Sequence, residues 1–205
     1  MPPVIPREIP EGEPALNNEL ICGLDEAGRG PLAGPVCAAA VILPGGFPLD
    51  ILDDSKKLSP SARSGARVVI CSRAIAWGLG WVSAAEIDEI NILNASLLAM
   101  KRAFESMSWK EGVSPGPVEA VVDGLFVPDI SAPSRALVKA DEKIPEVMAA
   151  SILAKTARDR MMELYSIFYP EYGYERHKGY PTAAHRAAIA CYGPSPIQRM
   201  TFKVK

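Results

Sequence analysis

The apolar positions of the chain fall into short runs of strand length and longer stretches with helical spacing. Five apolar runs, each bounded by turn residues, predict strands, at residues 20–24, 36–43, 77–82, 118–122 and 136–140. A stretch over residues 95–107 has apolar side chains three or four positions apart, which predicts a helix with Leu97, Met100, Phe104 and Met107 on one face. Strands mixed with helices in this way favour an α/β domain.

Residues that start helices refine this pattern. Ser59 followed by Pro60 is typical of a helix start, and Ser83 with Glu86 forms a capping box for a short helix. Pro145 opens a long helix whose small residues in its first half would let that end lie close against the sheet. The predicted apolar stripe of this helix consists of Val147, Ala150, Ala154, Ala157, Met161, Leu164 and Phe168.

Composition limits the number of domains and the class of protein. The 205 residues are 48% apolar and 22% charged, enough for one large domain with a substantial core. The net charge of −2 gives no global sign of a nucleic-acid binder. We find no signal peptide and no apolar run of the ~18 residues that span a bilayer, and expect a cytoplasmic protein without membrane contact. Widely spaced cysteines predict buried, reduced thiols at Cys22, Cys37, Cys71 and Cys191.

The two ends differ from the middle. Residues 1–18 hold five prolines, which predicts a flexible N-terminal leader. Residues 171–205 hold six lysines and arginines interleaved with aromatic residues. Such a mixture suits contact with a sugar-phosphate chain, and it equally suits a solvated helix with ordinary aromatic anchors.

Carboxylates follow several of the predicted strands. Asp25 and Glu26 come after the first run, Asp123 after the run at 118–122, and Asp141 after the run at 136–140. Side chains at strand ends converge on one edge of an open sheet, where clustered carboxylates repel unless a cation lies among them. Oxygen ligands favour Mg²⁺ or Mn²⁺, and two such ions about 4 Å apart could serve phosphodiester hydrolysis. Considered alone, each of these acids is also typical of a strand end or a turn.

The glycines of residues 28–34 allow a competing interpretation. Gly28, Gly30 and Gly34 fit a dinucleotide-binding pattern, with Asp50, Asp53 and Asp54 about twenty residues further on. That site requires a helix directly after the glycines, whereas here a predicted strand follows. The pattern therefore favours phosphate chemistry around a metal over dinucleotide binding.

Five segments, in this order, carry a family resemblance over about residues 20–202. They are DEAGRGPLAGP at 25–35, DSKKLS at 54–59, VVDG at 121–124, AASILAKTARDR at 149–160 and HKGYPT at 177–182. With them the chain resembles a type 2 ribonuclease H (ribonuclease HII). The resemblance implies a ribonuclease H-like α/β fold, with a central mixed β-sheet flanked by helices and a small C-terminal helical extension. It implies a catalytic domain at 19–170 and a substrate-contacting part at 171–205.

The resemblance also assigns roles. It makes Asp25, Glu26, Asp123 and Asp141 the catalytic, metal-binding acids, with Mg²⁺ or Mn²⁺ as cofactor. The implied reaction is hydrolysis on the 5′ side of a ribonucleotide, in RNA–DNA hybrids or singly embedded in duplex DNA, leaving a 3′-hydroxyl and a 5′-phosphate. A non-cleaving nucleic-acid-binding module of the same fold is the alternative. No obligate protein partner is evident, and we expect a monomer.

Substrate contacts are implied as well. Gly28, Arg29 and Gly30 match the element that recognises the 2′-hydroxyl and nearby phosphates, and Tyr180 matches a tyrosine that stacks on the deoxyribose beyond the RNA–DNA junction. Lys56 and Lys57 could hold backbone phosphates or belong to a solvated loop.

The chain departs from the family pattern near its fourth acid. Ala140 stands where the family usually has glycine, and Glu142 adds a charge beside Asp141. Gln198 replaces a common histidine, at a position that is not a metal ligand.

Other polar residues receive structural interpretations. Lys155 and Arg158 should share one face of the long helix, and Asp159 should form a surface ion pair. His177 and His185 are expected on the surface or beside the substrate.

Overall fold

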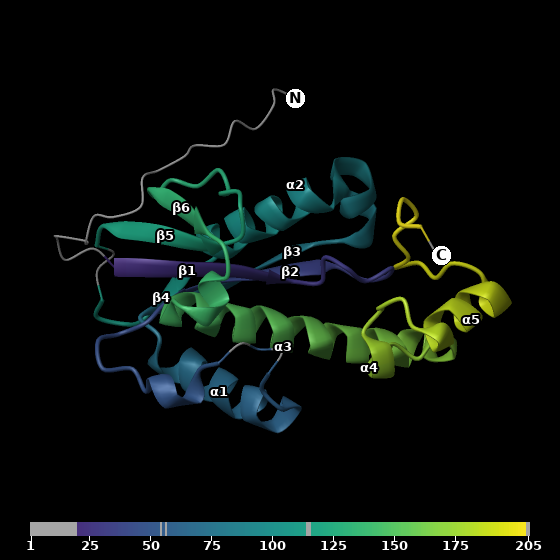
Figure 1. Ribbon diagram of the computed structural model, residues 1–205, viewed down its shortest axis with the longest axis horizontal. Helices are drawn as coiled ribbons and strands as arrows, with labels where there is room; N and C mark the ends of the chain where they lie inside the picture. Colours follow the sequence, from purple (N-terminus) through teal and green to yellow (C-terminus); the bar gives the residue numbers. More distant parts are fainter. Residues whose placement is uncertain (1–19, 54, 56, 114–115, 204–205) are drawn as a thin grey trace.

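A six-stranded mixed sheet forms the centre of the molecule in the computed structural model, which describes residues 20–53, 55, 57–113 and 116–203 (Figure 1). Its strand order is β4-β3-β2-β1-β5-β6, with β1, β5 and β6 parallel and the other neighbours antiparallel. The strands are β1 Leu20–Ala27, β2 Val36–Ile42, β3 Ala76–Val82, β4 Ser108–Trp109, β5 Val118–Asp123 and β6 Ser134–Leu137. The predicted leader at 1–18, Asp54 and Lys56 lie outside the described residues.

Helices cover both faces of this sheet. They are α1 Pro60–Arg73, α2 Ala84–Glu105, α3 Pro145–Phe168, α4 Tyr174–His177 and α5 Ala183–Tyr192, with short 3₁₀ turns η1 Leu49–Ile51, η2 Ala140–Glu142 and η3 Pro170–Tyr172. Figure 1 shows α2 on one face, α1 and α3 on the other, and α4 beside the far half of α3, while α5 packs on the turn η3. The mixed sheet flanked by helices is thus confirmed.

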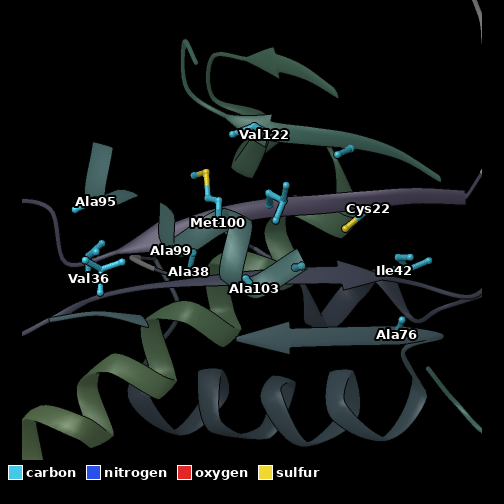
Figure 2. Packing of buried hydrophobic residues seen from close by; sticks show 14 of the residues in the cluster. Cys22, Val36, Ala38, Ile42, Ala76, Ala95, Ala99, Met100, Ala103 and Val122 are labelled. Atoms are coloured by element: carbon cyan, nitrogen blue, oxygen red, sulfur yellow. The ribbon is translucent and has the colours of Figure 1, made fainter. Parts of the chain in front are cut away.

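The strands follow the alternation expected of a sheet between two helical layers. Cys22 and Leu24 of β1 belong to the cluster that packs against α2, together with Met100 and Ala103 (Figure 2). Gly23 points to the other face, where a side-chain carbon would collide with the backbone at the start of α3. This alternation directs Asp25 toward α3 and Glu26 toward the α2 side.

The predicted helix starts are confirmed. Ser59 accepts a hydrogen bond from the Ala62 amide at 3.2 Å, and Ser83 and Glu86 form the reciprocal capping box. The two helices predicted around residues 83–107 are separated at Asn91, which has a φ of 65°. Its side chain accepts hydrogen bonds from the amides of residues 93 and 94, at 3.0 and 3.1 Å, and so restarts the helix.

The strand predicted at residues 136–140 is wrong in its second half. β6 ends at Leu137, Lys139 adopts a left-handed conformation with φ 59°, and Ala140 begins the turn η2. The Asp123 carboxylate accepts a hydrogen bond from the Ala140 amide at 2.9 Å, so this amide is committed to the turn and not to the sheet.

The apolar stripe predicted for α3 is correct only in its first half. Val147, Ala150 and Ala154 are buried, whereas Leu164 and Phe168 are 45% and 72% exposed. Beyond the sheet, α3 packs on the C-terminal segment through a different line of side chains, in which Met162 joins Tyr172 and Tyr174.

All four cysteines are free thiols. Cys22 and Cys37 are buried as predicted, and Cys71 is half-buried. The prediction is wrong for Cys191, which is exposed near the end of the amphipathic helix α5. Within the described part of the chain, no helix is long and apolar enough to cross a bilayer.

Candidate functional site

Three carboxylates meet at one edge of the sheet. Oxygen atoms of Asp25, Asp123 and Asp141 all lie within 4.8 Å of one another. The parallel register of β1 and β5 ends at the pair Leu24 and Val122, so Asp25 and Asp123 come next on adjacent strands. Asp141 reaches them from η2, held there by the bond from Ala140 to Asp123. The predicted convergence is therefore present for three of the four acids, and a turn and not a strand end supplies the third.

The electrostatics of this cluster favour a bound cation. Asp25 and Asp141 are 6% and 5% exposed. Burial raises the pKa of Asp25 well above its usual range, and the charges of Glu26 and Asp123 raise it further against hydrogen bonds from Ser151 and the Glu26 amide. A divalent metal among these oxygens would remove the repulsion, and an all-oxygen set fits Mg²⁺ or Mn²⁺.

Two serine hydroxyls, one on α3 and one in the loop before α1, form a chain of hydrogen bonds to Asp25. Ser151 is buried and hydrogen-bonds the Asp25 carboxylate, and its Oγ lies 2.9 Å from Oγ of the buried Ser55. Because Ser151 has one hydroxyl proton and gives it to the carboxylate, Ser55 is the donor in the serine pair. The loop that precedes α1 is thereby connected to a candidate metal ligand.

Glu26 lies apart from the three clustered acids. Its Oε1 atom is 3.3 Å from Nη1 of Arg29, and its carboxylate is not part of the group within 4.8 Å. Burial raises the pKa of Glu26, while the Arg29 guanidinium opposes the rise. A role for Glu26 in metal binding therefore stays a prediction.

The glycine-rich loop and the predicted tyrosine lie side by side. A side-chain carbon built on Gly30 would be 3.6 Å from Cε1 of Tyr180, whose side chain is 41% exposed. Gly28 has a φ of 106°, and a side chain there would collide with Arg158. Arg29 and Gly30 are exposed, so the loop presents backbone and one guanidinium to solvent beside an accessible ring.

Two buried arginines lie beneath this loop. Arg199 donates from Nε to the carbonyl of Gly34 at 2.9 Å, from Nη1 to those of Arg29 and Pro31 at 3.0 and 2.9 Å, and from Nη2 to that of Gly28 at 2.6 Å. Arg158 donates to the carbonyls of Pro35, Lys178 and Ala33, at 2.9, 3.0 and 3.2 Å. The sequence interpretation missed this role, because Arg199 counted only as one basic residue among six.

The histidines pack against the turn that carries Tyr180. The rings of His177 and His185 stack with centroids 4.5 Å apart, and Nδ1 of His185 lies 3.0 Å from the Tyr180 carbonyl. His185 was predicted on the surface or beside the substrate, and the surface position is wrong because the residue is fully buried. The N-terminal turn of α5, capped by Thr182, directs it inward. Burial lowers the pKa of its imidazole.

The lysines differ in their surroundings. Lys57 is exposed, and its Nζ atom lies 3.9 Å from Oδ1 of Asp53. Lys155 pairs with Asp159 at 2.7 Å, which confirms the predicted ion pair, although the Asp159 side chain is only 16% exposed. The ammonium of Lys155 and the guanidinium of Arg158 each lie 6.0 Å from the Tyr180 ring centroid.

The dinucleotide interpretation is wrong. Residues 28–35 lead directly into β2 and not into a helix, so the helix N-terminus that would hold a pyrophosphate is missing from this described segment.

Comparisons with known proteins identify relatives of this chain in sequence and in fold. The family model described as Ribonuclease HII matches residues 22–205. Ribonuclease HII of Treponema denticola is 55% identical over 91% of this chain and 99% of its own length, and that of Dechloromonas aromatica is 50% identical over 89% and 90%. The crystal structure of ribonuclease H2 from Pyrococcus horikoshii has a TM-score of 0.72 at 29% identity, covering 90% of this chain and 94% of that one.

Proposed function

The chain belongs to the ribonuclease HII family of metal-dependent endoribonucleases, and we propose that it hydrolyses the phosphodiester on the 5′ side of a ribonucleotide. The substrates would be RNA–DNA hybrids and duplex DNA with a single embedded ribonucleotide, and the products would carry a 3′-hydroxyl and a 5′-phosphate. The carboxylate cluster of Asp25, Asp123 and Asp141, in which Asp25 and Asp141 are buried and Asp123 is half-buried, is the observation that carries this proposal.

Each side of the site would have its own task. Asp25, Asp123 and Asp141 would hold Mg²⁺ or Mn²⁺, with Glu26 as a further ligand once Arg29 turns to the substrate. In two-metal-ion catalysis the bound ions activate water and stabilise the leaving oxygen. The protein itself supplies fixed carboxylate positions: Asp123 is held by the Ala140 amide and Asp25 by Ser151.

Recognition would take place beside the acids. The backbone of Gly28 and Gly30 allows close approach to the 2′-hydroxyl, the only group that distinguishes RNA from DNA at one nucleotide. Arg29 can fork onto a phosphate, and the exposed face of Tyr180 can stack on the neighbouring deoxyribose. Lys56 and Lys57 would contact phosphates further along. Action in the cytoplasm as a monomer belongs to the same proposal.

A non-cleaving binding module of the same fold is the alternative function. Clustered, buried acids repel the phosphates that a binder must hold, and they destabilise the fold when no cation is present. The intact cluster therefore favours the enzyme.

A nicking assay separates the two functions. A duplex with one ribonucleotide, incubated with Mg²⁺ or Mn²⁺, should be cut once, on the 5′ side of that ribonucleotide, and an all-DNA duplex of the same sequence should stay intact. Ligation and end-labelling of the products identify the 3′-hydroxyl and the 5′-phosphate. If the ribonucleotide duplex is bound but never cut with either metal, the binding module is the correct function.

A further inference from the structure

The loop over residues 28–35 rests on two buried guanidinium groups whose hydrogen bonds go to the backbone and not to acidic side chains. Arg199 and Arg158 are 0% and 1% exposed. Among the described residues, no carboxylate oxygen lies within 4.0 Å of a guanidinium nitrogen of Arg158 or Arg199. Their donors go instead to backbone carbonyls, four from Arg199 and three from Arg158.

These bonds fix the direction of the amides in the loop. In a trans peptide the C=O and the following N–H point to opposite sides, and the described chain has no cis peptide bonds. Arg199 draws the carbonyls of Gly28 and Arg29 inward. The N–H groups of Arg29 and Gly30 must therefore point away from Arg199, on a part of the loop that is exposed.

The peptide between Pro31 and Leu32 shows the same geometry, and here the N–H has a partner within the protein. The Pro31 carbonyl accepts from Arg199 at 2.9 Å, and the following amide, that of Leu32, donates in the opposite direction to the Gly179 carbonyl at 2.8 Å. Arg158 also donates to the Lys178 carbonyl. The two arginines thus set both the direction of the loop amides and the distance between the loop and Tyr180.

We propose that Arg199 is a positioning residue that aims two successive amides, those of Arg29 and Gly30, at the ribonucleotide and so sets the preference for RNA at the cleavage point. The inference rests on the proposed function. Only arginine offers five N–H groups in a fixed plane, which four separate carbonyls require. Lysine keeps the positive charge, but its three donors on one atom cannot reproduce that spread, so the loop amides lose their fixed direction.

Binding measured without cleavage tests the proposal. Arg199→Lys is compared with Arg67→Lys, which changes an exposed arginine on α1. In EDTA, wild type and Arg67→Lys should bind a single-ribonucleotide duplex more tightly than an all-DNA duplex. Arg199→Lys should lose about tenfold of that preference, the size of one good hydrogen bond, and bind all-DNA duplex as before. An unchanged preference in a folded Arg199→Lys protein would overturn the inference.

A second measurement keeps the inference testable if Arg199→Lys does not fold. In ¹⁵N-labelled wild type, the amide resonances of Arg29 and Gly30 should shift with the single-ribonucleotide duplex in EDTA and shift less with the all-DNA duplex. Equal shifts with both duplexes would overturn the inference. The nicking assay fails only if the proposed function fails, so a wild type that nicks ribonucleotides without selective amide shifts contradicts the inference alone.

Discussion

The acid cluster and the loop above the buried arginines differ in how their buried charges are stabilised. Asp25, Asp123 and Asp141 place like charges within 4.8 Å, and burial and neighbouring charge both raise the pKa of Asp25. Arg158 and Arg199 are more deeply buried than these acids, but seven backbone carbonyls satisfy their donors. The mutual repulsion in the first region favours a bound cation, whereas the described carbonyls already satisfy the guanidinium donors of the second region.

This difference separates two demands on the site. A metal centre positions its ligands before the ion binds, so the like charges of these ligands repel one another in the metal-free protein. A surface that recognises a single hydroxyl group must have a fixed conformation before the substrate binds. An amide that must be ordered on binding lowers both affinity and selectivity.

Asp123→Asn should have the largest effect, because it removes charge from the acid cluster and leaves the fold in place. The amide oxygen of asparagine can still accept the bond from Ala140, so η2 should keep its position. We expect the rate of nicking with Mg²⁺ to fall by more than about 100-fold, beyond the effect of losing an outer-sphere partner. Asp129→Asn, at a side chain that is 98% exposed, is the matched control and should cut normally. A normal rate for Asp123→Asn would remove Asp123 from the metal site.

Arg158→Ala tests the other region, where the expected loss is in stability. It leaves two buried carbonyls and one part-buried carbonyl without their donor, at about 1 kcal/mol or more each, so the free energy of unfolding should fall by about 3 kcal/mol. Urea denaturation measures the change. Arg160→Ala, on the exposed side of the same helix, should stay within about 0.5 kcal/mol. Equal losses in the two variants would show that the buried bonds add little.

The sequence predicts the two regions unequally. The acids follow apolar runs, so alternation and strand ends were enough to bring Asp25 and Asp123 together. The position of Asp141 was predicted for the wrong reason, since a bond from Ala140 to Asp123 ends the strand early. No local pattern marks that turn.

The arginines under the loop could not be recognised from local patterns at all. Arg199 lies more than 160 residues from the carbonyls that it binds, and its neighbours in sequence resemble an ordinary polar terminus. The same holds for His185, which a capped helix turns into the interior. Periodicity detects apolar burial, whereas the burial of a satisfied polar group depends on tertiary partners.

Ser151→Ala sharpens the comparison with a smaller effect on the acid side. The variant removes the hydroxyl that orients Asp25 and breaks the link to Ser55. We expect the affinity for Mn²⁺, measured by calorimetry, to fall about tenfold, the lower end of the cost of losing an outer-sphere partner. Ser166→Ala, at an exposed hydroxyl bond near the end of α3, should bind Mn²⁺ like wild type. If both variants bind alike, the hydroxyl pair does not orient the ligand.

The smallest expected effect concerns the stability of the metal-free protein. There Asp25→Asn should stabilise the fold, which is opposite in sign to the losses expected above. Because the folded-state pKa of Asp25 is raised, its contribution to stability is complete below the unfolded value of about 3.9 and is lost as pH rises through the folded pKa. Asparagine does not ionise, so in EDTA the Tm of the variant should exceed that of wild type by about 2–4 °C at pH 8, and the gap should narrow toward pH 5. Saturating Mg²⁺ should reverse the order, since only wild type gains from full ligation. A variant less stable than wild type at pH 8 in EDTA would mean that the acid cluster is satisfied without a metal, like the arginines.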